Sequence, residues 1–371
     1  MAHTPPAHER PCMNLVFGIL LCAPIIASLL PLLRCSHWTV RIFDFPRLQI
    51  AFVSLLLIIA SVIITNEPMW MVALQIINAL CLLYQLYKIS AYGPWHRKQV
   101  LDAQGPDDER TISILNSNVL TPNRDYQKVL DMVERYQPDL FLTLETDAWW
   151  EDKLKPLEQH YPYTVKIPLD NLYGMHLYSR LELSDTEVRH WVKEDIPSIV
   201  SKVILRSGEH IKIYCLHPEP PAPGESDVST PRDAELLLAG KEIDHTDETV
   251  IVFGDMNDVA WSHTTRLFQK ISGLLDPRVG RGLFNTFHAH HWFLRWPLDH
   301  MFVSNDFLVK KLLRLGNVGS DHFPVYAKFQ YHPKAEALQP ELKADVEDHQ
   351  DANATIAEAE PIKEVVDTKY D

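Results

Sequence analysis

The chain has 371 residues, of which 46% are hydrophobic, and a formal net charge of −14 at pH 7. It is longer than one average domain of ~100–200 residues, which leaves room for additional segments. The acidic balance disfavours an undiscriminating duplex-binding protein, because such proteins usually present a basic face to the phosphate backbone.

Three apolar segments lie near the N-terminus, at residues 14–33, 48–65 and 69–87, and none contains Asp, Glu, Lys or Arg. About 20 apolar residues at ~1.5 Å rise cross a hydrocarbon core of ~30 Å, so we expect a bundle of three transmembrane helices within residues 1–99. A cleaved signal peptide is the alternative for the first segment, but that segment exceeds the ~7–15 apolar residues of a signal and lacks a small-residue cleavage site. A soluble helical core is disfavoured because a soluble helix normally keeps a polar face.

The charges around these helices bear on orientation. Arg34, Arg41 and Arg47 lie between the first two helices, and Lys88 and Arg97 follow the third. By the positive-inside tendency, the domain that follows would face the cytoplasm.

Residues 100–333 show alternating helix and strand signals. The apolar spacing from residue 126 to 133 is that of an amphipathic helix, and helices are also expected at 232–243 and near 262–271. Residues 200–206 and 211–216 predict a hairpin, residues 249–253 a strand, and residues 299–304 and 324–330 a final strand pair. Helices mixed with hairpins predict an α/β domain whose sheets are not purely parallel.

Polar residues stand where several predicted strands end. Asn118 ends an alternating strand, Glu145 ends a continuous apolar run, and Gly254-Asp255-Met256-Asn257-Asp258 follows the strand at 249–253. Carboxylate and amide oxygens are hard ligands, so a divalent cation and a phosphate could meet at this sheet edge.

Residues 334–371 differ in composition from the rest. They hold eleven Asp/Glu against four Lys, a net charge of −7, and no Phe or Trp. Low hydrophobicity combined with like charge predicts an acidic disordered tail.

Charge is unevenly distributed along the middle of the chain. Residues 100–333 carry −11, whereas residues 251–333 carry +3. A locally positive half suits an anionic substrate, although ordinary solvated surface charge explains each residue equally well.

From Asn118 to Asp321-His322, the ordered motifs resemble those of the endonuclease/exonuclease/phosphatase superfamily, in a membrane-anchored, bacterial-type form. The similarity covers roughly residues 110–331, with matches in the family's order at Asn118, Glu145, His217 in Cys215-Leu216-His217-Pro218, Asp255, Asn257, Asp299 in Pro297-Leu298-Asp299-His300, and Asp321-His322. The resemblance implies a four-layer α-β-β-α sandwich of two mixed sheets. It also complicates orientation, since relatives with a similar three-helix anchor place this domain outside, and we leave the side open.

Metal-assisted phosphoester hydrolysis requires a cation, a positioned water and donors to the phosphoryl oxygens. Glu145 is the strongest metal-ligand candidate. The resemblance places Asn118 beside the metal and brings Asp321 within its reach. Hard oxygen ligands favour Mg²⁺, with Mn²⁺ as an alternative, over zinc.

Among the remaining matches, His322 is the acid/base candidate because imidazole titrates near neutral pH. By resemblance, Asp299 is its carboxylate partner, Asp255 orients or deprotonates the attacking water, and Asn257 binds the phosphate. His217 would donate to the phosphate or protonate the leaving group.

Two further features admit more than one interpretation. Arg180 resembles a family substrate-binding position but could equally support neighbouring loops. The loop with His288, His290 and His291 next to Trp292 and Trp296 could form a substrate rim or a membrane-facing edge.

These observations predict a hydrolase: an integral membrane, divalent-metal-dependent phosphodiesterase, anchored in a bacterial inner membrane. Its expected substrate is a lipid head group or a nucleic acid, and no obligate protein partner is inferred. The alternatives are a membrane-tethered binding module without catalysis and a true nuclease. A channel or transporter is disfavoured because the helices lack charged residues.

Overall fold

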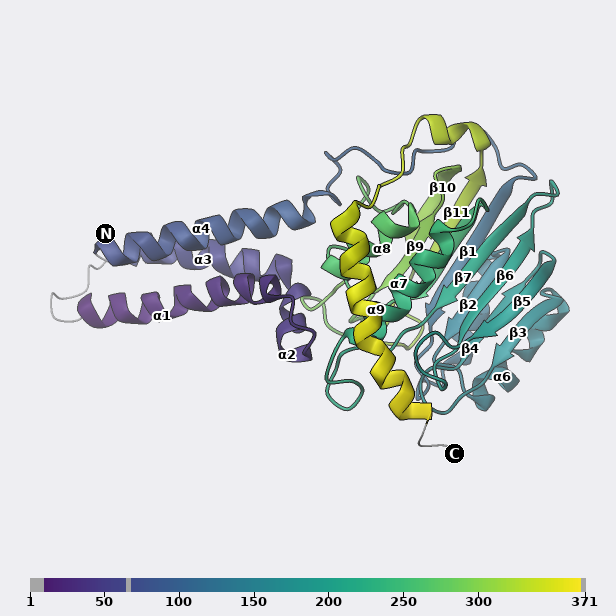
Figure 1. Cartoon of the computed structure of the whole chain (residues 1–371), viewed down its shortest axis with the longest axis horizontal. Coiled ribbons are helices and arrows are strands. Elements are labelled where there is room, and N and C mark those ends of the chain that lie inside the picture. The colour runs from purple at the N-terminus through teal and green to yellow at the C-terminus, as the bar shows by residue number, and fades with distance from the viewer. Residues whose placement is uncertain (1–9, 65–67, 368–371) are drawn as a thin grey trace.

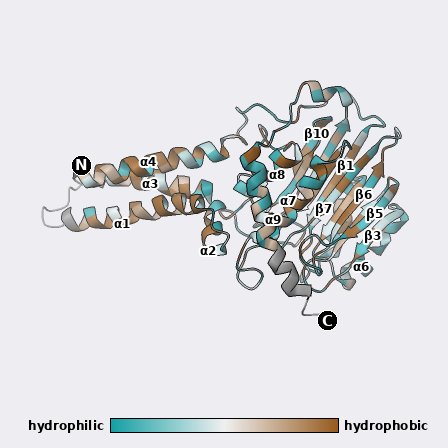
Figure 2. Ribbon diagram, in the orientation of Figure 1, coloured by the Kyte–Doolittle hydropathy of each residue, from teal (hydrophilic) through white to brown (hydrophobic). Residues whose placement is uncertain are grey.

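The computed structural model describes residues 10–64 and 68–367 (Figure 1). A bundle of three long helices, α1 (Arg10–Leu29), α3 (Arg47–Ile64) and α4 (Met69–Ser90), projects from one side of the α/β domain. The bundle is largely hydrophobic along its length (Figure 2). Residue 65, the predicted end of the second helix, lies outside the described residues.

Two helical stretches of the described chain, Cys12–Leu33 and Met69–Ser90, are long and apolar enough to cross a membrane. The first includes the 3-10 turn η1 (Leu30–Leu33). The expected third span is present only as a bent pair, Trp38–Asp44 and Arg47–Ile63, whose axes differ by 74°. Pro46 lies at the bend, where its missing backbone N–H cannot continue the hydrogen bonds of the preceding helical turn. The structure therefore supports two of the three predicted spans, and the third only if the bent pair is one span.

The α/β domain contains two mixed sheets. The six-stranded sheet has the order β10 (Phe307–Arg314), β11 (Val325–Tyr331), β1 (Thr111–Asn118), β2 (Leu140–Leu144), β4 (Met175–Ser179) and β3 (Tyr163–Ile167). The five-stranded sheet has the order β5 (Leu183–Arg189), β6 (Ser198–Ile204), β7 (His210–Leu216), β8 (Val250–Asp255) and β9 (Asp299–Val303). In each sheet one pair is parallel, β1 with β2 and β7 with β8, and the other pairs are antiparallel.

The two sheets pack face to face between helices. Ile112 and Ile114 of β1 share one buried core with Ile213 of β7 and Ile251 of β8, so alternate residues of β1 face the other sheet. Helices α5 (Tyr126–Tyr136) and α6 (Ala148–Leu154), the latter followed by η3 (Lys155–Gln159), cover the outer face of the six-stranded sheet. Helices α7 (Thr230–Asp244) and α8 (His263–Ser272) cover the five-stranded one. This is the expected α-β-β-α sandwich.

The expected pairing of the last two predicted strands is wrong. The strands predicted at 299–304 and 324–330 do not pair with each other: β9 joins the five-stranded sheet and β11 the six-stranded sheet, next to the unpredicted β10. Strand period reveals which face is buried but not which strand is the neighbour.

The described part of the acidic tail is not disordered. It forms η4 (Pro333–Ala337) and the helix α9 (Val346–Asp367), which lies across the α7 and α8 side of the domain (Figure 1). Ala352 is fully buried against Leu237 and Leu267, and Lys270 pairs with Asp348 at 2.8 Å. The domain thus supplies apolar contacts and countercharges that composition alone does not reveal. Residues 368–371 lie outside the described chain.

Candidate active site

The strand directions bring the predicted site residues to one end of the sandwich. Asn118, Glu145, His217 and Asp255 stand at or just after the carboxyl ends of β1, β2, β7 and β8. β9 and β11 run antiparallel to β8 and β1, so their amino ends reach the same edge. Asp299 begins β9 directly opposite Asp255, and His322 shortly precedes β11. The order of strands thus gathers these side chains, as the strand-end pattern predicts.

The His322 and Asp299 side chains form a buried dyad. His322 Nδ1 lies 2.8 Å from Asp299 Oδ2, and its Nε2 lies 3.4 Å from Asp255 Oδ2. Burial alone would lower the pKa of His322, but the Asp255 and Asp299 carboxylates outweigh it and raise that pKa to about 10. The imidazole is therefore protonated at neutral pH, held between two carboxylates.

A second chain of contacts joins the two sheets through Asn118. Its Nδ2 donates to Glu145 Oε1 at 2.7 Å and to Asp255 Oδ2 at 3.2 Å. Burial raises the pKa of Glu145 to about 7, partly opposed by the Asn118 hydrogen bond. Burial likewise raises the pKa of Asp255. The Glu145 backbone has a φ of 60°. Residues other than Gly and Asn rarely adopt this left-handed conformation, and it often marks functional sites.

The donor set suits a hard divalent cation. Ligand atoms of Asp255, Asp299 and His322 lie within 4.8 Å of one another. Glu145 Oε2 is buried and has no hydrogen-bond partner among the described residues. A buried carboxylate oxygen without a donor is costly unless a cation approaches it. The residues present therefore fit a hard divalent cation, toward which Glu145 offers a carboxylate oxygen that no described donor occupies.

His217 and Asn257 lie beside this cluster. His217 is buried next to the Tyr173 ring at 5.4 Å between centroids, and its Nδ1 has no hydrogen-bond partner among the described residues. Burial lowers the pKa of His217 to about 4, so its ring is neutral at pH 7 and suits hydrogen bonding better than proton donation. Asn257 uses one N–H of its amide on Pro218 O at 3.0 Å and keeps a second donor.

Asp321 joins the site and Arg180 does not. Asp321 lines the same cavity as Glu145, Asp255 and His322. Arg180 follows β4, which runs antiparallel to β2, so it lies at the opposite end of the sheet, where its backbone N–H donates to Asp139 O. Its guanidinium contacts Gln137 O and lies over the Tyr161 ring. The substrate-binding role suggested for Arg180 is therefore wrong, and the loop-supporting alternative fits.

Asn116 is a site residue that the sequence analysis missed. It is 1% exposed in β1, and its Nδ2 donates to Asp299 Oδ1 at 3.0 Å across the two sheets. Asn116 and Asn118 are two residues apart and therefore face the same side of the strand. The available signal was a second amide on the same strand face as the predicted site residue Asn118.

The comparisons with known proteins agree with this geometry. Residues 109–322 match the model of the Endonuclease/Exonuclease/phosphatase family. The chain belongs to this family. Membership confirms the expectation of a hydrolase acting on phosphoester bonds and supports a metal-dependent reaction.

Solved structures share the fold. A D. rerio TDP2 humanized by 14 mutations is 17% identical with a TM-score of 0.51, and the match covers 60% of this chain and 99% of that one. D. rerio TDP2 complexed with a single-strand DNA product gives the same identity and TM-score, with coverage of 59% and 99%. The human Nocturnin catalytic domain is 18% identical with a TM-score of 0.49, covering 61% and 96%. No curated protein matches significantly. At these identities the likeness concerns the fold alone.

Proposed function

We propose that this family member is a membrane-anchored, Mg²⁺-dependent phosphodiesterase. One observation carries the proposal: Asn118, Glu145, Asp255, Asp299 and His322, which come from both sheets, are linked by hydrogen bonds and an ion pair at one edge. A domain that no longer catalyses a reaction would be expected to lack some of these groups. The apolar helix bundle beside the domain supports membrane anchoring, in a bacterial inner membrane as the sequence suggests.

Each residue has a role in this proposal. Glu145, with Asn118 and Asp321 beside it, would hold the cation, which would neutralise phosphoryl charge and lower the barrier to attack by water. Asp255 orients or deprotonates the attacking water. His322, held by Asp299, keeps its proton at Nε2 and stabilises or protonates oxygen as charge develops. Asn257 and His217 donate hydrogen bonds to the phosphate.

The proposal is tested with the full-length chain in detergent micelles and bis(4-nitrophenyl) phosphate as the diester. We expect turnover with Mg²⁺ or Mn²⁺ and none with a chelator. His322→Ala should lower kcat by about 10²-fold to 10⁴-fold, the usual contribution of a general acid or base. His210→Ala is a matched control, because His210 is exposed at the other end of β7.

Glu145→Gln should raise the concentration of Mg²⁺ needed for half-maximal activity, whereas Glu134→Gln, on the exposed face of α5, should not. Turnover that survives the chelator, or a folded His322→Ala protein with full activity, would contradict the mechanism. Absence of turnover for every phosphoester offered would favour the non-catalytic binding module.

A further inference from the structure

The catalytic groups form only one wall of a larger cavity. The cavity has a volume of about 340 Å³ and is lined by Glu145, His217, Asp255 and His322 on the catalytic side. This volume lies within the ~300–1,000 Å³ range of small-molecule sites. Asn257 and Asp321 also belong to the catalytic side. Apart from Arg41 and Glu225, the remaining lining is mainly apolar and includes Trp38, Ile42 and Phe45 of the anchor and Leu172, Pro221 and Trp296 of three loops of the α/β domain.

The anchor's share of this wall comes from the short helices α2 (Trp38–Arg41) and η2 (Ile42–Asp44), and backbone contacts fix it to the α/β domain. The Trp38 N–H donates to Asp227 O at 2.9 Å, and the Ser229 N–H donates to Ser36 O at 2.8 Å. The Trp261 Nε1–H donates to Asp44 O at 2.7 Å. Both ends of the segment are therefore attached to the domain that carries the catalytic residues.

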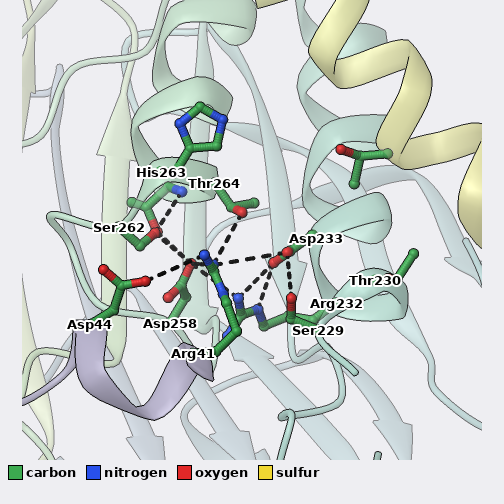
Figure 3. Close-up of polar contacts among 12 residues, drawn as sticks. Arg41, Asp44, Ser229, Thr230, Arg232, Asp233, Asp258, Ser262, His263 and Thr264 are labelled. Carbon is green, nitrogen blue, oxygen red and sulfur yellow. Dashed lines mark hydrogen bonds and ion pairs between the residues drawn. The ribbon is translucent and has the colours of Figure 1, made fainter. Parts of the chain in front are cut away.

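A buried ionic cluster strengthens this junction (Figure 3). The Arg41 side chain is 7% exposed and pairs with Asp44 at 3.3 Å, Asp258 at 3.8 Å and Asp233 at 3.9 Å. Arg232 completes the cluster by pairing with Asp233 and Asp258 while donating to Asn257 O at 2.8 Å. Separating Arg41 from these buried carboxylates would be costly, so the cluster holds the anchor segment against the α/β domain beside the cavity.

The cavity also adjoins the start of the apolar bundle. The Phe45 ring meets the Trp296 ring edge-on at 5.8 Å between centroids. In the first turn of α3, Gln49 Nε2 donates to Phe293 O at 2.5 Å. Trp292 is 81% exposed in the same loop. Exposed aromatic side chains level with the start of an apolar helix are typical of a membrane interface.

The cavity is poorly suited to a polyanion. Among its lining residues, all of which belong to the described chain, the only Lys or Arg is Arg41, whose charge is already shared by three carboxylates. A nucleic-acid strand needs cations along its backbone. An apolar chain, by contrast, gains free energy from burial against these side chains.

We propose that this cavity binds the apolar tail of an amphiphilic phosphoester, with the phosphate on the catalytic residues and the tail against Trp38, Ile42 and Phe45. The inference rests on the proposed function and narrows its substrate class to lipid-like phosphoesters presented at the bilayer surface. The membrane anchor then serves as part of the substrate site as well as a tether.

The test compares two diesters of 4-nitrophenol, one carrying a methyl group and one an octyl group, on the full-length chain in nanodiscs with Mg²⁺. We expect kcat/KM to be at least about tenfold higher for the octyl diester, since each buried methylene favours binding. Ile42→Asp and Leu172→Asp, which place charge on the anchor part and on a loop of the α/β domain in the cavity lining, should lower this octyl-to-methyl ratio by about tenfold. Val188→Asp on β5 is the matched control, because Val188 is 43% exposed, compared with 51% for Ile42 and 37% for Leu172, and lies outside the cavity lining.

The outcomes separate the two proposals. Three results would overturn the tail site and leave the proposed phosphodiesterase activity unaffected. These are equal kcat/KM for both diesters, an unchanged octyl-to-methyl ratio in both folded cavity variants, and faster cleavage of a single-stranded oligonucleotide than of the octyl diester. If neither diester is cleaved, or if His322→Ala cleaves both as well as the unmodified chain does, the proposed function itself fails. Circular dichroism confirms that each variant is folded.

Discussion

Asp299 shows how a single carboxylate orders the candidate site. Its Oδ1 accepts a hydrogen bond from Asn116 and its Oδ2 is paired with His322, so both oxygens are engaged. Asp299 is 4% exposed; its partner Asn116 comes from β1 of the opposite sheet, and His322 comes from the loop before β11. Asp299 therefore fixes the orientation and protonation of the imidazole while the packing of the two sheets holds it in place.

Replacing Asp299 by Asn should impair turnover more than substrate binding. The amide removes the charge that stabilises protonated His322, so we expect kcat to fall by about 10²-fold or more while KM changes by less than about threefold. Steady-state kinetics on the chromogenic diester measure both. Asp306→Asn is a suitable control, since Asp306 is 6% exposed and hydrogen-bonded to Thr249 away from the site. A purely structural Asp299 would show a lower melting temperature with an unchanged kcat in the folded fraction.

At the scale of elements, α9 shows why composition wrongly predicted a disordered tail. Asp345 and Asp348 exchange backbone N–H to carboxylate hydrogen bonds at 3.0 and 2.9 Å, an arrangement like a capping box that starts the helix. Ala352, Ile356 and Ala359 recur on one face and pack against α7 and α8. The acidic residues meet Lys270 and His263 of α8. The cap and the small apolar stripe were visible in the sequence, but the countercharges belong to another part of the chain.

A charge placed on the buried face of α9 tests this packing. Ala352 is fully buried whereas Ala354, two residues later, is exposed. Ala352→Asp should lower the stability of the domain by at least about 2 kcal/mol, because it buries an unpaired carboxylate, and Ala354→Asp should change it by less than about 0.5 kcal/mol. Thermal melting followed by tryptophan fluorescence compares them. Equal melting temperatures for the two variants would mean that α9 does not pack as described.

At the scale of the whole molecule, basic residues of the first anchor loop connect the anchor to the α/β domain. Arg47 donates to Asp44 at 2.6 Å and to Gln85 of α4 at 2.9 Å, and Arg41 joins the buried cluster with Asp233 and Asp258. By the positive-inside tendency, these arginines served as a signal of orientation. In the folded protein they bind the helices to one another and to the domain, which accounts for their presence without reference to a side of the membrane.

Arg41→Gln tests whether the junction depends on this charge. Removing one member of a buried ion pair leaves its carboxylates uncompensated and typically costs about 3–5 kcal/mol, so we expect a clearly lower melting temperature in detergent micelles. Arg34→Gln is the matched control: Arg34 is 67% exposed and pairs with Asp351 at 3.2 Å, a surface contact that contributes about 0–1 kcal/mol. If both substitutions had the same small effect, the Arg41 cluster would not stabilise the junction.

The sequence by itself determined the apolar helices and the polar residues Asn118, Glu145 and Asp255 at strand ends, because hydrophobic period and strand ends are local properties. The class of chemistry followed from the resemblance of the ordered motifs to a known family. Only the tertiary structure decided that Asn116 supports Asp299, that Arg180 lies at the far end of the sheet, that α9 is ordered, and that Trp38 and Ile42 complete the cavity. Each of these depends on contacts between residues distant in the chain. Such contacts are set by how two sheets and an anchor pack together, which no local pattern encodes.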